Sequence, residues 1–140
     1  MAKDFCLPYS EIAIYNCDSY FKCADFIPLT RDPSVKGIIP CSIESGDAWS
    51  FCKANNKSEL VEVTEKNRIS NLSSVGFYYF SDANVFFDRS VQYISTFDKK
   101  SEIYVAPFYN TYLKMSDRVL VPQVDFFKAM GGEILNLVES

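Results

Sequence analysis

The sequence predicts a single α/β domain with a mixed, mostly parallel sheet and flanking helices. Apolar runs of strand length alternate with stretches whose apolar residues recur at helical spacing. The 140 residues are enough for one domain with a hydrophobic core, so we assign residues 1–140 to it. No repeat, low-complexity stretch or linker interrupts the chain. Strands and helices alternate too often for a β-sandwich.

The N-terminal part of the chain predicts two buried strands. Residues 1–7 have the pattern of the end of a helix. Residues 11–18 are mostly apolar and end in polar residues, which is typical of a strand in a sheet covered on both faces. Residues 20–30 predict a short helical turn. Residues 35–43 predict the second strand, which Pro40 interrupts.

The middle of the chain predicts a β-hairpin and a further strand. Residues 49–54 alternate between apolar and polar side chains, and residues 60–66 return after the turn at residues 55–58. Residues 73–80 are aromatic-rich and form the next predicted strand. Gly76 within it indicates a bulge or the close approach of another group.

The last part of the chain predicts two helices and a strand. Asp82 is a candidate N-cap, and apolar residues follow it at helical spacing as far as Phe97. Pro107 suits the first turn of the next helix. Residues 119–124 predict the final strand, and residues 133–138 predict a short terminal helix.

Composition excludes several classes of function. The formal net charge is -4 and no cluster of Lys and Arg is present, so we expect no nucleic-acid partner. No apolar run is long enough to span a membrane. The 5 cysteines are odd in number and none is at CxxC spacing, which disfavours a disulfide framework. We therefore expect a cytoplasmic protein with mostly buried, reduced thiols.

The chain contains no histidine. This excludes Ser-His and Cys-His catalysis and zinc sites that use imidazole. Any metal site must use oxygen ligands, which favours Mg²⁺ or Mn²⁺ over Zn²⁺.

Asp18 and the Glu65-Lys66 pair are the leading polar candidates for a site. Asp18 follows the first predicted strand, at the sheet edge where α/β proteins bind ligands, and its carboxylate could hold a divalent ion. The alternative role is that of a turn or helix-cap aspartate. Glu65 can accept hydrogen bonds from two sugar hydroxyls and Lys66 can meet a phosphate, unless the pair is only a solvated charged turn.

Three further candidates are Trp49, Gly76 and Asn110. The single tryptophan, Trp49, could stack on a sugar ring or belong to the core. Gly76 could allow a ligand or a neighbouring aromatic ring to approach the backbone. Asn110 lies near the start of the second predicted helix.

Five segments together resemble the sugar-nucleotide pyrophosphorylases, which are also called sugar-1-phosphate nucleotidyltransferases. In order, these segments are residues 16–19 (NCDS), 47–51 (DAWSF), 63–72 (VTEKNRISNL), 75–80 (VGFYYF) and 102–110 (EIYVAPFYN). The chain resembles the C-terminal half of these enzymes, in the branch found beside capsule and surface-polysaccharide genes. The resemblance implies part of the Rossmann-like nucleotide-diphospho-sugar transferase fold.

The resemblance also implies roles for individual residues. Asp18 would act in catalysis and hold Mg²⁺ or Mn²⁺ near the sugar phosphate. Lys66 would act in catalysis by contacting the phosphate, and Glu65 would bind sugar hydroxyls. Gly76 would present its backbone to the ligand, and Trp49 and Asn110 would complete the substrate site.

The expected activity is formation of a nucleotide-sugar from a nucleoside triphosphate and a sugar phosphate, with release of pyrophosphate. The glycine-rich nucleotide loop with which these enzymes begin has no counterpart here. We therefore expect a chain that is incomplete alone, and that forms a homo-oligomer or binds a partner supplying the missing half. The alternative is a non-catalytic module that binds sugar phosphate or another protein.

Overall fold

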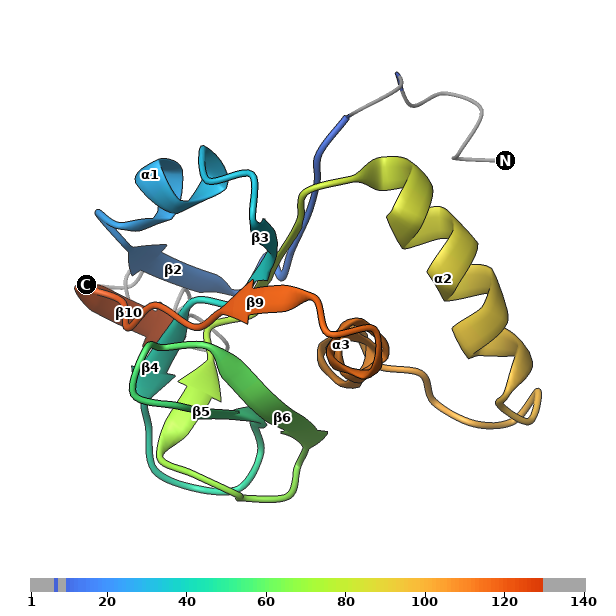
Figure 1. The fold of residues 1–140 in the computed structure, drawn as a ribbon. Helices are drawn as coiled ribbons and strands as arrows, with labels where there is room; N and C mark the ends of the chain where they lie inside the picture. Colours follow the sequence, from blue (N-terminus) through green and yellow to red (C-terminus); the bar gives the residue numbers. More distant parts are fainter. Residues whose placement is uncertain (1–6, 8–9, 130–140) are drawn as a thin grey trace.

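The computed structural model describes residue 7 and residues 10–129. The described residues form two four-stranded sheets and one two-stranded sheet, with the two longer helices to one side and a short helix to the other (Figure 1). The helices expected at residues 1–7 and 133–138 lie outside the described residues. No helix in the described part of the chain is both long and apolar enough to cross a bilayer.

The first sheet has the strand order β1-β8-β3-β9. Its strands are β1 (Ile12–Tyr15), β8 (Phe77–Phe80), β3 (Val35–Ile38) and β9 (Arg118–Leu120). Only β3 and β9 pair in parallel, and β8 runs antiparallel to both of its neighbours. Strand β1 lies at the edge, and its side chains alternate between half-buried and exposed. The prediction that this strand is buried on both faces was therefore wrong.

The second sheet has the strand order β4-β7-β5-β6 and is antiparallel throughout. Its strands are β4 (Cys41–Ile43), β7 (Leu72–Ser74), β5 (Ser50–Ala54) and β6 (Leu60–Glu65). The predicted hairpin of β5 and β6 is confirmed. The prediction of a mostly parallel sheet was wrong, because the segments that form β3–β4 and β7–β8 run antiparallel to each other through both sheets and so set most strand directions.

Two predicted strands each pass between the first sheet and the second. Residues 35–43 divide at Pro40 into β3 and β4, and residues 73–80 divide at Gly76 into β7 and β8. The two segments meet at the division, where the Val75 amide donates to the Pro40 carbonyl oxygen at 3.1 Å.

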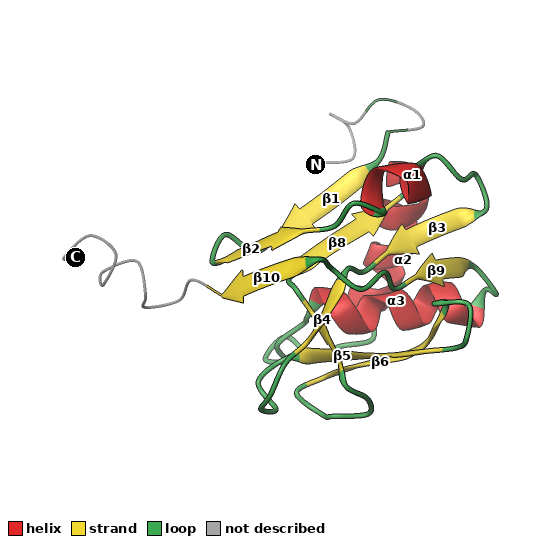
Figure 2. Cartoon of the chain, turned by 90° about the vertical axis from the view of Figure 1, so that its left-hand side faces the viewer, coloured by secondary structure: helices red, strands yellow, loops and turns green. Residues whose placement is uncertain are grey.

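A separate ribbon pairs β2 (Ser19–Lys22) with β10 (Phe126–Ala129) in antiparallel register. The expected helical turn therefore begins later than predicted, as α1 (Phe26–Thr30). Residues 19–22 are extended because a strand about a hundred positions later supplies their backbone partners, a pairing that no local pattern announces. Figure 2 shows this ribbon beside β1 and β8.

The two longer helices begin where the sequence predicts. Asp82 caps α2 (Ala83–Ser95) by accepting hydrogen bonds from the Asn84 and Val85 amides. Pro107 lies in the first turn of α3 (Val105–Lys114). Helix α3 buries four of its residues and lies between the first sheet and the β5–β6 hairpin (Figure 2). Helix α2 buries only Ala83 and lies on the outer side of α3 (Figure 1).

Tyr109 of α3 is at the centre of the core. It is fully buried, and its ring stacks on Phe80 with centroids 4.4 Å apart. Its hydroxyl donates to the Tyr79 carbonyl oxygen at 2.7 Å. A side chain at Gly37 would bring its Cβ to 2.6 Å from this ring, which explains the glycine in β3.

The described cysteines have no disulfide. Cys41 and Cys52 are buried, whereas Cys17 is exposed and Cys23 is half-buried. The expectation of mostly buried thiols therefore holds for only two of these four residues.

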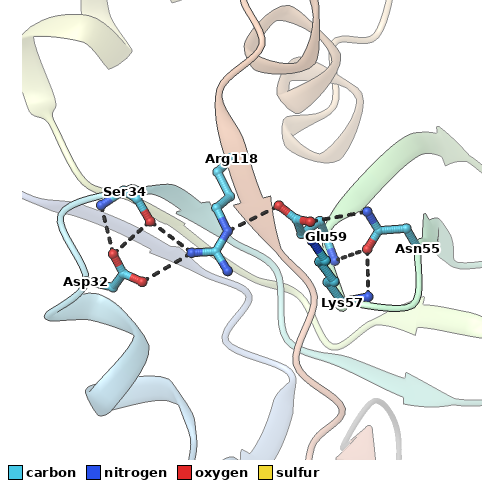
Figure 3. Close-up of polar contacts among 6 residues, drawn as sticks. All are labelled: Asp32, Ser34, Asn55, Lys57, Glu59 and Arg118. Carbon is cyan, nitrogen blue, oxygen red and sulfur yellow. Dashed lines mark hydrogen bonds and ion pairs between the residues drawn. The ribbon is translucent and has the colours of Figure 1, made fainter.

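Arg118 connects three segments that are distant in sequence (Figure 3). Its guanidinium donates to Asp32 and to Glu59, each at 3.2 Å, and to the Ser34 hydroxyl at 2.9 Å. Asn55 holds the hairpin turn by accepting hydrogen bonds from the amides of Lys57 and Glu59. The tip of the β5–β6 hairpin is thereby attached to the start of β9.

We predict that Ser34 controls the titration of Asp32. Hydrogen bonds from the Ser34 side chain and amide, followed by the Arg118 charge, hold the Asp32 pKa below its ordinary value. The stabilisation from Asp32 is therefore complete above its unfolded-state pKa of about 3.9 and is lost as pH falls through the lower folded-state pKa. In Ser34→Ala, NMR titration of the Asp32 carboxyl carbon should show a raised pKa. Ser95→Ala is the matched control, because Ser95 donates only to a backbone carbonyl.

Candidate functional site

A cavity of about 210 Å³ lies where the two sheets and the β2–β10 ribbon meet. We call it the junction cavity. Its lining comes from the β1–β2 turn, the start of β5, the end of β6, the β7–β8 connection and β10: Asn16, Asp18, Ser19, Ala48, Trp49, Ser50, Glu65, Ser74, Val75, Gly76, Tyr78, Phe127 and Ala129. Four predicted site residues are among them: Asp18, Trp49, Glu65 and Gly76.

Asp18 lies in the turn that follows β1, as the sequence predicts. Two hydrogen bonds hold this turn against the β7–β8 connection. The Asn16 amide donates to the Gly76 carbonyl oxygen at 2.8 Å, and the Ser19 hydroxyl donates to the Val75 carbonyl oxygen at 2.8 Å. The carboxylate of Asp18 is therefore carried by a turn that is fixed to the opposite wall of the cavity.

Gly76 is needed for two reasons. Its φ is 82°, in the left-handed region that favours glycine. A Cβ there would also lie 2.7 Å from the Asn16 side-chain nitrogen. The close approach that the sequence predicts therefore comes from Asn16 of the protein itself, beside the cavity.

Glu65 is the last residue of β6 and lies opposite Ser50 at the open end of the hairpin. The Ser50 hydroxyl donates a short hydrogen bond to the Glu65 carboxylate. This bond uses one acceptor position and leaves the other oxygen of Glu65 to accept from a ligand.

Lys66 lies outside the lining of the junction cavity. Its φ of 54° ends the strand geometry of β6, and its amide donates to the Trp49 carbonyl oxygen at 2.9 Å. Its Nζ lies 3.4 Å from the Tyr104 hydroxyl and 5.3 Å from the centroid of that ring. The Tyr104 hydroxyl donates in turn to Glu102. The hydrogen bond with Tyr104 raises the pKa of Lys66, so its ammonium stays charged near neutral pH.

Trp49 and Phe127 form the aromatic wall of the junction cavity. Their ring centroids are 5.8 Å apart with the planes nearly perpendicular. The indole Nε1 donates to the Ser45 carbonyl oxygen at 2.8 Å. The sequence identified Trp49 but not Phe127, because Phe127 reaches the cavity only through the pairing of β10 with β2.

Asn110 lies apart from the junction cavity, on α3. Its side-chain oxygen accepts from the Val63 amide at 3.3 Å, and its side-chain nitrogen donates to the Val63 carbonyl oxygen at 2.9 Å. Both ends of the Asn110 amide are thus occupied by the backbone of β6.

The chemistry of the cavity is that of a hydrogen-bond acceptor. Asp18 and Glu65 carry its charge, and no Lys or Arg is among its described lining residues. Burial raises the pKa of Tyr78, so its phenol stays protonated and adds a polar group without charge. The sequence analysis did not select the other polar lining residues, because their local sequence does not distinguish them from ordinary turn or strand residues. They are Asn16, Ser19, Ser50, Ser74 and Tyr78. Such a cavity suits a ligand rich in hydroxyl groups.

The described residues include no group of three or more acidic or cysteine side chains that could hold a metal alone. Mg²⁺ is commonly held by one or two carboxylates together with substrate phosphates and water. Asp18 fits that arrangement as a single carboxylate ligand. The residues therefore suit an ion that arrives with a phosphorylated ligand.

No protein-family profile matches the chain, and a search of curated proteins finds no significant match. Solved structures do match. The nucleoside-diphosphate-sugar pyrophosphorylase from Vibrio cholerae RC9 superposes with a TM-score of 0.79 at 22% identity, over 99% of this chain and 60% of that one. A structure from Bacillus anthracis, assigned as a glucose-1-phosphate thymidylyltransferase and solved with sucrose, gives a TM-score of 0.71 at 13% identity, over 98% and 55%.

The chain therefore has the fold of a large part of the sugar nucleotidyltransferases, as the sequence resemblance implied. It spans between 55% and 60% of the length of these two structures.

We predict that Gly76→Ala destabilises the protein more than Gly46→Ala. Gly46 has a similar φ of 84° but open space around it, so it measures the backbone strain alone, about 1–2 kcal/mol. Gly76→Ala adds the clash with Asn16, for an extra penalty of about 1–3 kcal/mol in urea unfolding. The double variant Gly76→Ala with Asn16→Ala should recover much of the extra part, because it removes the side-chain nitrogen at 2.7 Å while the Cβ of residue 16 stays at 3.1 Å. Equal losses for the two single glycine variants would contradict the close contact.

Proposed function

We propose that this chain is the sugar-phosphate-binding part of a sugar-1-phosphate nucleotidyltransferase. The observation that carries the proposal is the junction cavity, which gathers Asp18, Trp49, Glu65 and Gly76 from four separate segments. These residues were selected from the sequence, and they line one cavity in a fold shared with sugar nucleotidyltransferases.

The cavity matches the neutral part of a sugar phosphate. Glu65 and Asp18 accept from hydroxyl groups, and the Ser50 hydroxyl extends the same polar surface. Trp49 and Phe127 offer an apolar wall for the carbon face of a ring. At about 210 Å³ the cavity has room for a monosaccharide-sized group.

The phosphate would lie near Asp18, which would share Mg²⁺ with it. The Lys66 backbone is bonded to Trp49 of the cavity lining, and the Lys66 ammonium would contact the phosphate after leaving Tyr104. Bound Mg²⁺ would neutralise phosphate charge, with Asp18 as its protein ligand. The proposed catalytic residues, Asp18 and Lys66, thus act on the phosphate, whereas Glu65 orients the sugar.

In the proposed reaction an oxygen of the sugar phosphate attacks the α-phosphorus of a nucleoside triphosphate. A new P–O bond forms, the bond to the bridging oxygen of pyrophosphate breaks, and pyrophosphate leaves. Such reactions depend on orientation and charge neutralisation, which the junction cavity supplies for the nucleophile. The nucleotide would be held by a segment or partner outside the described residues.

We predict that Asp18→Asn and Lys66→Ala each abolish the binding of hexose 1-phosphates. The first loses the carboxylate that would share Mg²⁺ with the phosphate, and the second loses the cation. Binding is measured by calorimetry with a panel of hexose 1-phosphates and Mg²⁺, with circular dichroism as the check on folding. Asp98→Asn and Lys57→Ala are matched controls, because both residues are exposed and line no described part of the cavity.

Wild-type affinity in both Asp18→Asn and Lys66→Ala would show that the site is wrongly assigned. Pyrophosphate release from nucleoside triphosphates and hexose 1-phosphates separates catalysis from binding alone. Binding without release by this chain favours the non-catalytic sugar-phosphate module. Release by the isolated chain would contradict the expectation that it is incomplete alone.

We also predict that the chain self-associates. Strand β1 is at the edge of its sheet, and three nearby aromatic residues are about half exposed: Tyr15 at 47%, Tyr20 at 45% and Phe126 at 48%. Exposed strand edges and apolar surface favour association. Light scattering at micromolar concentration should give a mass above 16.0 kDa, and a monodisperse monomer would contradict this prediction.

A further inference from the structure

Residues 44–48, which lead into Trp49 at the wall of the junction cavity, lie outside the strand pairs, whereas the Trp49 carbonyl oxygen itself accepts from the Lys66 amide. Residues 44–49 connect β4 to β5, and residues 45–48 are exposed. Gly46 reverses the chain with a φ of 84° and has open space around it. The Trp49 indole bonds to Ser45, so its orientation depends in part on whatever fixes this exposed segment.

Arg68 fixes it from the loop after β6. Its Nη2 donates to the carbonyl oxygens of Glu44, at 3.0 Å, and Gly46. Its Nε donates to the Asp47 carboxylate at 3.2 Å, and its Nη1 donates to the Ser70 carbonyl oxygen at 3.2 Å. One guanidinium thus joins three positions of the Trp49 segment to its own loop.

The guanidinium is itself supported by the core. Its central carbon lies 4.4 Å from the centroid of the Phe51 ring, and Phe51 is fully buried in β5. The Trp49 indole donates to Ser45 of the same segment. The segment is therefore attached to Arg68 on one side and to the indole on the other.

We propose that Arg68 is a positioning residue that acts through Trp49 and so helps to determine which sugar the junction cavity accepts. Only arginine offers several N–H donors in a planar fork that also stacks on a ring. Lysine keeps the charge but cannot join the same set of acceptors. The part concerning sugar choice rests on the proposed function, whereas the placement of Trp49 does not.

The test uses Trp49, the only tryptophan of the chain, as a ligand-independent reporter. In Arg68→Lys and Arg68→Ala we expect the emission of Trp49 to shift to longer wavelength and acrylamide to quench it more strongly. Affinity for the hexose 1-phosphates that bind the wild type should fall about tenfold, which corresponds to about 1.4 kcal/mol. Far-UV circular dichroism identifies folded variants, and Arg68→Lys serves if the alanine variant does not fold.

Arg89→Lys is the matched control. Arg89 also forms an ion pair, with Asp117, and also lies over an aromatic ring, 4.5 Å from the Tyr112 centroid, but it does not line the junction cavity. It should leave Trp49 fluorescence unchanged. Asp47→Asn should also have little effect, because Asp47 is 76% exposed and the carbonyl contacts of Arg68 remain.

Unchanged emission and quenching in both Arg68 variants would overturn the proposal. If Asp47→Asn changes Trp49 emission and quenching as much as Arg68→Ala does, the ion pair and not the carbonyl contacts places Trp49, and that part of the proposal fails. If the Arg68 variants alter Trp49 but wild-type protein binds no hexose 1-phosphate, the positioning of Trp49 stands and the proposed function fails.

Discussion

The junction cavity depends on one place where two antiparallel chain segments pass side by side between the first sheet and the second. Pro40 and Gly76 mark these passages, and the Val75 amide bonds to the Pro40 carbonyl oxygen between them. Pro40 has no amide proton to continue a ladder, and Gly76 adopts a φ that other residues rarely take. Because both strands change sheets there, the space beside them is bounded by the ends of several elements, each of which can present a side chain.

The division of polar groups in this space is consistent with the two parts of a sugar phosphate. The acceptors Asp18 and Glu65 line the cavity, whereas the ammonium of Lys66 is held outside by Tyr104. If all three groups converged, Lys66 would neutralise the carboxylates and occupy their acceptor positions. Holding the cation apart leaves the carboxylates open to hydroxyl groups.

Local patterns predicted the local structure well. The β5–β6 hairpin, the Asp82 cap and the helix around Pro107 all follow from turn, capping and periodicity signals within a few residues. The β2–β10 ribbon and the strand directions were not predictable, because they depend on partners far along the chain. The same limit applies to the site. Asp18 and Glu65 were recognisable as polar strand ends, but Phe127 and the contact of Lys66 with Tyr104 are products of tertiary structure.

Asn110 gives β6 a substitute for a neighbouring strand. Strand β6 ends its sheet, so its outer amide and carbonyl groups would otherwise be open to another chain. At Val63 the Asn110 amide makes both bonds that a neighbouring strand would make. A protein that exposes apolar residues can thereby keep this edge from adding strands of other molecules. At this point of β6 the edge is therefore closed to the backbone of another chain.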